Sequence, residues 1–226
     1  MKIAFSIVTC FCILLIVALS SHAEPKPAAG QGGKPLFDGK TLDGWTQLPA
    51  ESWTVRDGAM SSKGVGRGVI YTNNQYSRYR LTFTMRHISG KPDHAACVLI
   101  FCTNPPPALD ALGGIQFQVP NGGHWDYRKG HNNDGKAFFT KHDHPKFDAS
   151  QWSRVELLVD ATTGTARMAV AQPPDAKAVE VLDFRDPTAG QKGPIAWQMH
   201  NKGLLDEYKD VRIEVDPKDD SLITTR

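Results

Sequence analysis

Two histidine-containing pairs in the middle of the chain have the residue types and the spacing of a metal site. One residue separates His124 from Asp126, and one separates His142 from His144. Side chains of an extended segment change face at every residue, so each pair places two ligands on the same side of the chain. Imidazole and carboxylate together suit Zn²⁺, Mn²⁺ or a related ion. The spacing therefore predicts a divalent metal ion held by these four residues, and a solvated loop is the alternative interpretation of His142 and His144.

The residues beside the first pair are suited to bind a small polar ligand. Trp125 offers an aromatic ring face, and Tyr127 and Arg128 offer hydrogen-bond donors. This aromatic and charged mixture follows two glycines, and binding residues commonly lie on such loops. We therefore expect a functional loop here, although pairing with Asp126 is the alternative role of Arg128.

Glutamines alternate with apolar residues in two segments. In GIQFQV, Gln116 and Gln118 fall on the face opposite the apolar side chains. In IAWQMH, Gln198 and His200 do the same. We expect these four residues to form the polar lining of a concave sheet face.

The elements that must position these residues have the two-residue period of β-strands. In SRYRLTFTMRHI, Tyr79, Leu81 and Phe83 share one face and polar side chains share the other, which is typical of a half-buried strand. Turn signals such as Asp57-Gly58 and Thr163-Gly164 separate about ten short strands. No helical period of convincing length occurs outside the leader. The pattern predicts an all-β sandwich of two antiparallel sheets.

The first residues have the pattern of a secretory signal peptide, with Lys2, an apolar run and small residues at Ser21 and Ala23. We therefore expect a periplasmic or secreted protein. The predicted organisation is a signal peptide at 1–23, a flexible linker at 24–35, one β-sandwich domain at 36–216 and a C-terminal tail at 217–226.

The charge of the chain limits its partners. The formal net charge is +2, and loss of Lys2 with the leader lowers it by one to about +1. This charge gives no drive toward nucleic acid or an anionic membrane surface, so we expect a neutral or small partner; the family resemblance described below implies that it is a small oligosaccharide or glycoside. No Gly-rich phosphate loop is present, and we expect no organic cofactor.

Two cysteines, Cys97 and Cys102, follow the leader in a predicted buried strand. Their odd separation points the sulfurs to opposite faces if the strand is straight. We therefore expect two unbridged, buried thiols that behave as small apolar residues.

Several blocks of the chain together resemble one family. LFDGKTLDGW, WTVRDGAM, YRLTFTMR, GIQFQV and the closing GPIAWQMHNKGLLDEYKDVRIEV resemble, in that order, the 3-keto-disaccharide hydrolase family, which includes 3-keto-glucoside lyases and hydratases. The similarity covers nearly the whole mature chain. It implies a concanavalin A-like jelly roll and chemistry on sugars oxidised at carbon 3, often with a divalent metal. Many relatives carry an acidic residue at the position of Gln116, so this chain resembles a distinct branch.

The chemistry implied by the resemblance requires a base, an electrophile and an acid. A ketone at carbon 3 acidifies the proton on carbon 2, and its removal lets the enediolate expel the glycosidic oxygen from carbon 1. The candidate catalytic residues are His124, Asp126, Tyr127, Arg128 and His200, and the candidate substrate-binding residues are Gln116, Gln118, Trp125 and Gln198. A non-catalytic carbohydrate-binding module that uses the same concave face is the alternative function.

Other titratable residues have weaker patterns. Asp206 and Glu207 suit an acid or base, but the preferred interpretation is a turn in which they pair with Lys202 or Lys209. We interpret His94 as a surface residue, and His87 and His131 carry still weaker signals.

Overall fold

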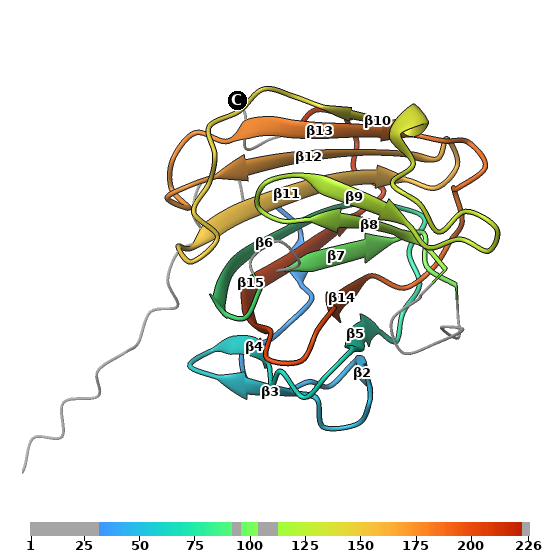
Figure 1. Ribbon diagram of the computed structural model, residues 1–226. Coiled ribbons are helices and arrows are strands. Elements are labelled where there is room, and N and C mark those ends of the chain that lie inside the picture. The colour runs from blue at the N-terminus through green and yellow to red at the C-terminus, as the bar shows by residue number, and fades with distance from the viewer. Residues whose placement is uncertain (1–31, 92–95, 104–112, 223–226) are drawn as a thin grey trace, which may run out of the picture.

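The computed structural model describes residues 32–91, 96–103 and 113–222. The segments with a two-residue period form fifteen strands in it. The strands form two antiparallel sheets, drawn together in Figure 1. The predicted concanavalin A-like sandwich is therefore confirmed. The predicted signal peptide, His94 and the last four residues of the predicted tail lie outside the described residues. Within the described part, no helix is long and apolar enough to cross a bilayer.

The larger sheet has nine strands, and β6 and β15 are its longest. Eight of them follow the spatial order β10 (Phe139–Lys141), β13 (Val179–Arg185), β12 (Thr165–Ala171), β11 (Ser153–Asp160), β6 (Arg78–Ser89), β15 (Leu205–Val215), β4 (Ala59–Ser62) and β3 (Trp53–Arg56). The ninth, β1 (Lys34–Pro35), pairs with β15. The 3₁₀ turn η2 (Lys136–Phe138) leads into β10.

The smaller sheet has six strands and carries the predicted glutamine face. Its spatial order is β2 (Trp45–Leu48), β5 (Gly68–Thr72), β14 (Ala196–Met199), β7 (Cys97–Ile100), β8 (Ile115–Gln118) and β9 (Gly123–Asp126). The strands β8 and β9 form a hairpin at one edge of this sheet.

The hydrophobic core lies between the two sheets and is centred on Trp197. Its ring centroid lies 5.1 Å from that of Trp45 and 5.6 Å from that of Phe83. Tyr208 contacts the same indole at 5.3 Å. Aromatic pairs at these separations add to the free energy of area burial, so this cluster joins β2 and β14 to β6 and β15.

The predicted hairpins are confirmed by the strand register. Asp57 and Gly58, both with positive φ, join β3 to β4, and Gly164 with φ +64° lies in the turn between β11 and β12. The predicted linker ended too late, because Lys34 and Pro35 already pair with Ile213 and Arg212 of β15.

The outer face of β6 is more buried than its alternating pattern predicts. Arg80, Thr82 and Thr84 are 2–4% exposed, although they point away from the core. The C-terminal segment 217–222 lies across this face, and Leu222 packs against Leu158. The strand is therefore covered on both sides, which corrects the half-buried prediction.

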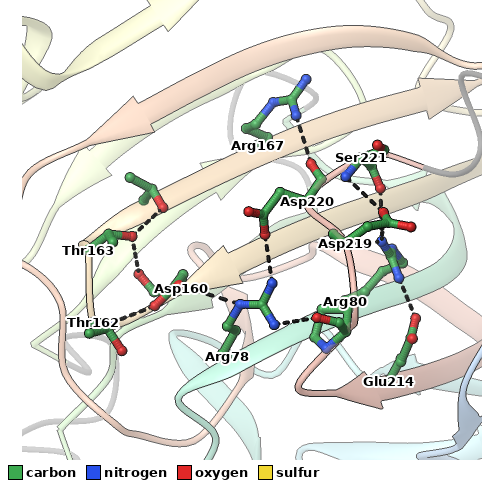
Figure 2. A network of polar contacts seen from close by, with 12 residues as sticks. Arg78, Arg80, Asp160, Thr162, Thr163, Arg167, Glu214, Asp219, Asp220 and Ser221 are labelled. Carbon is green, nitrogen blue, oxygen red and sulfur yellow. Dashed lines mark hydrogen bonds and ion pairs between the residues drawn. The ribbon is translucent and has the colours of Figure 1, made fainter.

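Arginines bind this C-terminal segment, as Figure 2 shows. Arg78 donates to the carbonyl of Pro217 and to Asp220, and Arg167 donates to the carbonyl of Asp220. Arg80 donates to the carbonyl of Ser221 at 2.8 Å. The predicted tail is therefore docked through residue 222.

Arg80 also pairs with Glu156, which has no exposed surface, at 2.9 Å. An Arg80→Met substitution leaves this buried carboxylate without its cation, and we expect a loss of roughly 3–5 kcal/mol in the free energy of unfolding, measured with urea. Arg167 is 40% exposed in its own ion pairs, so Arg167→Met is the control, with a loss of about 0–1 kcal/mol. Equal losses in the two variants would contradict the special role of Arg80.

Candidate functional site

The outer face of the six-stranded sheet brings the three predicted glutamines together. Gln118 and Gln198 are register partners of Cys97 on either side of β7. Gln116 pairs with Leu99 of the same strand, and its amide donates to the thiol of Cys97 at 2.6 Å. Gln116 and Gln198 are almost fully buried. The predicted common face of the glutamines is therefore present.

A cavity of about 740 Å³ lies over this face. It brings together six of the predicted catalytic and substrate-binding residues with four further ones; its lining residues are Arg67, Gln116, Gln118, Trp125, Tyr127, Arg128, Lys129, Gly130, Asn132 and His200. We call this cavity the outer-face pocket. Gln198 lies next to it and donates to the hydroxyl of Tyr127 at 3.4 Å.

Trp125 presents a rigid aromatic surface at the pocket. It lies opposite Gln116 in the β8–β9 register and is 38% exposed. Its Nε1–H donates to Oδ1 of Asn132 at 3.0 Å, which fixes the orientation of the indole. Such a ring suits stacking on the apolar face of a sugar.

Arg128 forms a wall of the pocket and is held by two carboxylates. Its Nη2 lies 2.7 Å from Asp126 and 2.5 Å from Asp186, and its Nη1 donates to Thr188 at 2.9 Å. The hydrogen bond with Asp126 raises the pKa of Arg128. Since these carboxylates already neutralise the guanidinium, the geometry assigns Arg128 a positioning role and leaves Asp126 no free coordination site.

His124 is a packing residue in the structure. On β9 it lies opposite the core residue Phe117, and its ring stacks on Phe139 with centroids 4.3 Å apart. Its Nε2 is buried and has no hydrogen-bond partner among the described residues. Burial lowers the pKa of His124, which favours the neutral ring. His124 therefore does not line the outer-face pocket.

His142 and His144 line a different cavity, of about 1220 Å³, with His87. Nε2 of His142 lies 2.9 Å from Asp183. Nδ1 of His144 donates to the carbonyl of Pro145 at 2.8 Å, and the ring stacks on Phe147. We call this cavity the imidazole pocket.

The predicted metal site does not fit this arrangement. The structure does not gather His124, Asp126, His142 and His144, because Asp126 is paired with an arginine and His124 is packed against an aromatic ring. The two-residue spacing sets the side of the chain on which each pair lies, but it does not bring the two pairs together. The metal chemistry predicted from the sequence therefore has no preformed site in these four residues.

A cluster of metal-ligand composition occurs elsewhere in the described chain. His142, Glu180 and Asp183 place one ligand atom each within 4.8 Å of one another. Arg167, however, donates to both oxygens of Glu180 at 2.7 and 2.8 Å and approaches Asp183 at 3.3 Å. The arginine already supplies the positive charge that an ion would bring to these carboxylates.

His200 lies at the end of β14 beside Arg67, which the sequence did not single out. Nη2 of Arg67 lies 3.3 Å from Nε2 of His200, and Nδ1 of His200 lies 3.3 Å from Oδ1 of Asn201. A guanidinium only donates, so Nε2 of His200 is the acceptor in this contact.

A buried dyad of His87 and Asp206 is a second feature that sequence reasoning missed. Nδ1 of His87 lies 2.8 Å from Asp206, which also accepts from the backbone of Ala96 at 3.2 Å. Glu207 pairs with Arg56 and Arg86. The predicted pairing of these acids with Lys202 or Lys209 is therefore wrong, because Asp206 and His87 are register partners on β15 and β6.

Comparison with known proteins places the chain in a family. The sequence profile of the 3-keto-alpha-glucoside-1,2-lyase-like domain matches residues 32–214. The chain belongs to this family. No curated protein sequence matches it. The lyase-like family assignment confirms the resemblance seen in the sequence and spans nearly all of the described residues.

Solved structures share the fold of this lyase-like chain at low identity. A candidate glycosyl hydrolase from Parabacteroides distasonis ATCC 8503 has a TM-score of 0.59 at 15% identity, covering 82% of this chain and 94% of that one. The carbohydrate binding module CBM66 from Bacillus subtilis has a TM-score of 0.55 at 12% identity, covering 76% and 95%. The VIP36 exoplasmic/lumenal domain, in a form with Ca²⁺ and Man3GlcNAc bound, has a TM-score of 0.55 at 8% identity, covering 80% and 89%. These identities establish a shared sandwich only.

The His87–Asp206 dyad predicts how the free energy of unfolding depends on pH. The hydrogen bond with Asp206 raises the pKa of His87 above its usual value of 6.5. A raised folded-state pKa gives stability that is complete below the unfolded-state pKa and is lost as the pH rises through the folded-state pKa. We therefore expect the free energy of unfolding to fall as the pH increases above 6.5, and to fall less in His87→Gln. Parallel urea-unfolding profiles of the two proteins across this range would exclude the linkage.

Proposed function

We propose that this protein is an exported carbohydrate-active enzyme that cleaves or hydrates 3-keto-glycosides in the outer-face pocket. The observation that carries the proposal is the convergence of glutamine amides, an oriented tryptophan and a histidine beside an arginine in one cavity, on a chain of the lyase-like family. The leader pattern supports a periplasmic or secreted location.

Binding of the sugar follows from the chemistry of the lining. Amide groups both donate and accept, so Gln116 and Gln118 suit sugar hydroxyls that do the same. Gln198 donates to the hydroxyl of Tyr127 and so orients this lining residue. Trp125 supplies the stacking surface, and its hydrogen bond to Asn132 reduces the entropy lost on binding.

The proposed reaction uses His200 as base. Nε2 of His200 takes the proton from carbon 2, and the electron pair forms an enediolate with the ketone at carbon 3. Arg67 transfers its hydrogen bond from this nitrogen to the developing oxyanion when the sugar binds, which frees the lone pair of Nε2, and Tyr127 lies in the same pocket to assist. The bond from carbon 1 to the glycosidic oxygen then breaks, and water supplies the proton to the leaving group. No step of this scheme uses a metal ion.

A non-catalytic carbohydrate-binding module is the second candidate. No carboxylate occurs among the described residues that line the pocket. The family resemblance implies an acid at the position of Gln116 in many relatives. The likeness of the fold to CBM66 is compatible with this function.

Exchange at carbon 2 separates the two functions. We expect the protein to exchange this proton of 3-keto-trehalose for deuterium and to release glucose, both followed by NMR in D₂O. His200→Gln should lower both rates by about 10²- to 10⁴-fold, because the base is lost, while binding by calorimetry changes little.

Asn73→Ala is the control, since Asn73 accepts a hydrogen bond from Thr46 and lies outside the pocket lining. It should retain the wild-type rates. Binding of the sugar without any exchange by the wild-type protein would favour the binding module, and absence of binding would refute both functions.

A further inference from the structure

The imidazole pocket is a preformed cavity that the proposed reaction does not use. Its floor contains the buried side chains of Val119 and Phe147, and polar groups such as Asn121, His142 and Lys146 surround them. An apolar floor with a few polar groups is typical of a ligand site, and its volume of about 1220 Å³ exceeds that of the outer-face pocket.

Three sets of hydrogen bonds hold the loop that closes this pocket, residues 145–150. The side chain of Asn121 donates to the carbonyl of Phe147 and accepts from its backbone N–H, at 2.9 and 2.8 Å. Gln172 forms the same double contact with the backbone of Asp148. The backbone N–H of His87 donates to the carbonyl of Ala149 at 2.7 Å. These hydrogen bonds therefore fix the loop in place at the border of the cavity.

One side chain lines both cavities. Gln118, the last residue of β8, borders the outer-face pocket and the imidazole pocket. Its amide occupies the space beside Gly123, where an added Cβ would lie 2.2 Å from the Gln118 oxygen. Glycine at position 123 therefore allows Gln118 to lie between the two cavities, and its φ is not positive, so alanine is tolerated by the backbone.

We propose that the two pockets form one binding groove, in which Gln118 contacts an oligosaccharide of at least two rings as it passes from the outer-face pocket into the imidazole pocket. This inference rests on the proposed function, because it assigns the first ring to the outer-face pocket. The second ring packs on Val119 and Phe147, and the imidazole and amide groups of the pocket bind its hydroxyls.

Calorimetry with one-ring and two-ring probes tests the groove. The probes are methyl 3-keto-α-glucoside and 3-keto-trehalose, and the protein is His200→Gln, so that the probes are not consumed. We expect the two-ring probe to bind at least about tenfold more tightly, because only it reaches the imidazole pocket. In NMR spectra, the amides of residues 145–150 should shift with the two-ring probe and not with the one-ring probe.

Variants in this background localise the gain. Asn121→Ala frees the closing loop and should abolish the advantage of the two-ring probe without weakening the one-ring probe. Asn73→Ala, which removes a hydrogen bond outside both pockets, is the matched control and should keep the advantage. Gly123→Ala displaces the Gln118 amide, so it should weaken binding of the two-ring probe as much as Gln118→Ala does. The double variant should bind this probe no more weakly than either single variant.

The outcomes are distinguishable. Equal affinities for the two probes, or unshifted amides at residues 145–150, would overturn the groove and leave the proposed function standing. Absence of binding by either probe would overturn the proposed function and the groove together. The NMR measurement needs none of these loop variants. It therefore shows whether the two-ring probe reaches the imidazole pocket even where Asn121→Ala fails to fold.

Discussion

Buried polar side chains in this sandwich depend on partners that the fold supplies, and this requirement organises the outer faces of both sheets. A buried charge is tolerated where an opposite charge and hydrogen bonds replace its water. Glu156 meets Arg80 beneath the C-terminal segment, and Asp126 meets Arg128 beside the outer-face pocket. Asp206 of β15 meets His87 of the neighbouring strand β6.

The histidines differ in their surroundings: one packs against the core and another lines a pocket. His124 stacks on an aromatic ring at the edge of the core, where burial favours its neutral form. His200 instead lines a pocket, where Arg67 contacts its Nε2 at 3.3 Å. Neutral hydrogen bonds hold the other lining residues of this pocket, from Trp125 to Asn132 and from Gln116 to the thiol of Cys97.

Predictions from the sequence succeeded where the controlling interaction is local. Alternation along GIQFQV and IAWQMH placed Gln116, Gln118 and Gln198 on one face, because the period of a strand is a property of the backbone. The metal hypothesis failed to gather its residues because spacing along one strand says nothing about which other segment faces it. The thiols stayed unbridged as predicted. Cys102, however, packs with the outer-face residue Leu99, since the positive φ of Phe101 interrupts the alternation.

The amino-acid sequence by itself determined the strands, the faces that enter the core, the tight turns and the family. Each of these depends on neighbours in the chain or on the order of a few motifs. Only the tertiary structure decided that His87 meets Asp206 across 119 residues, that Arg67 faces His200, and that two cavities adjoin at Gln118. The physical reason is that pairing between distant strands is settled by closure of the whole sheet and by burial of its polar groups. No short stretch of sequence contains that information.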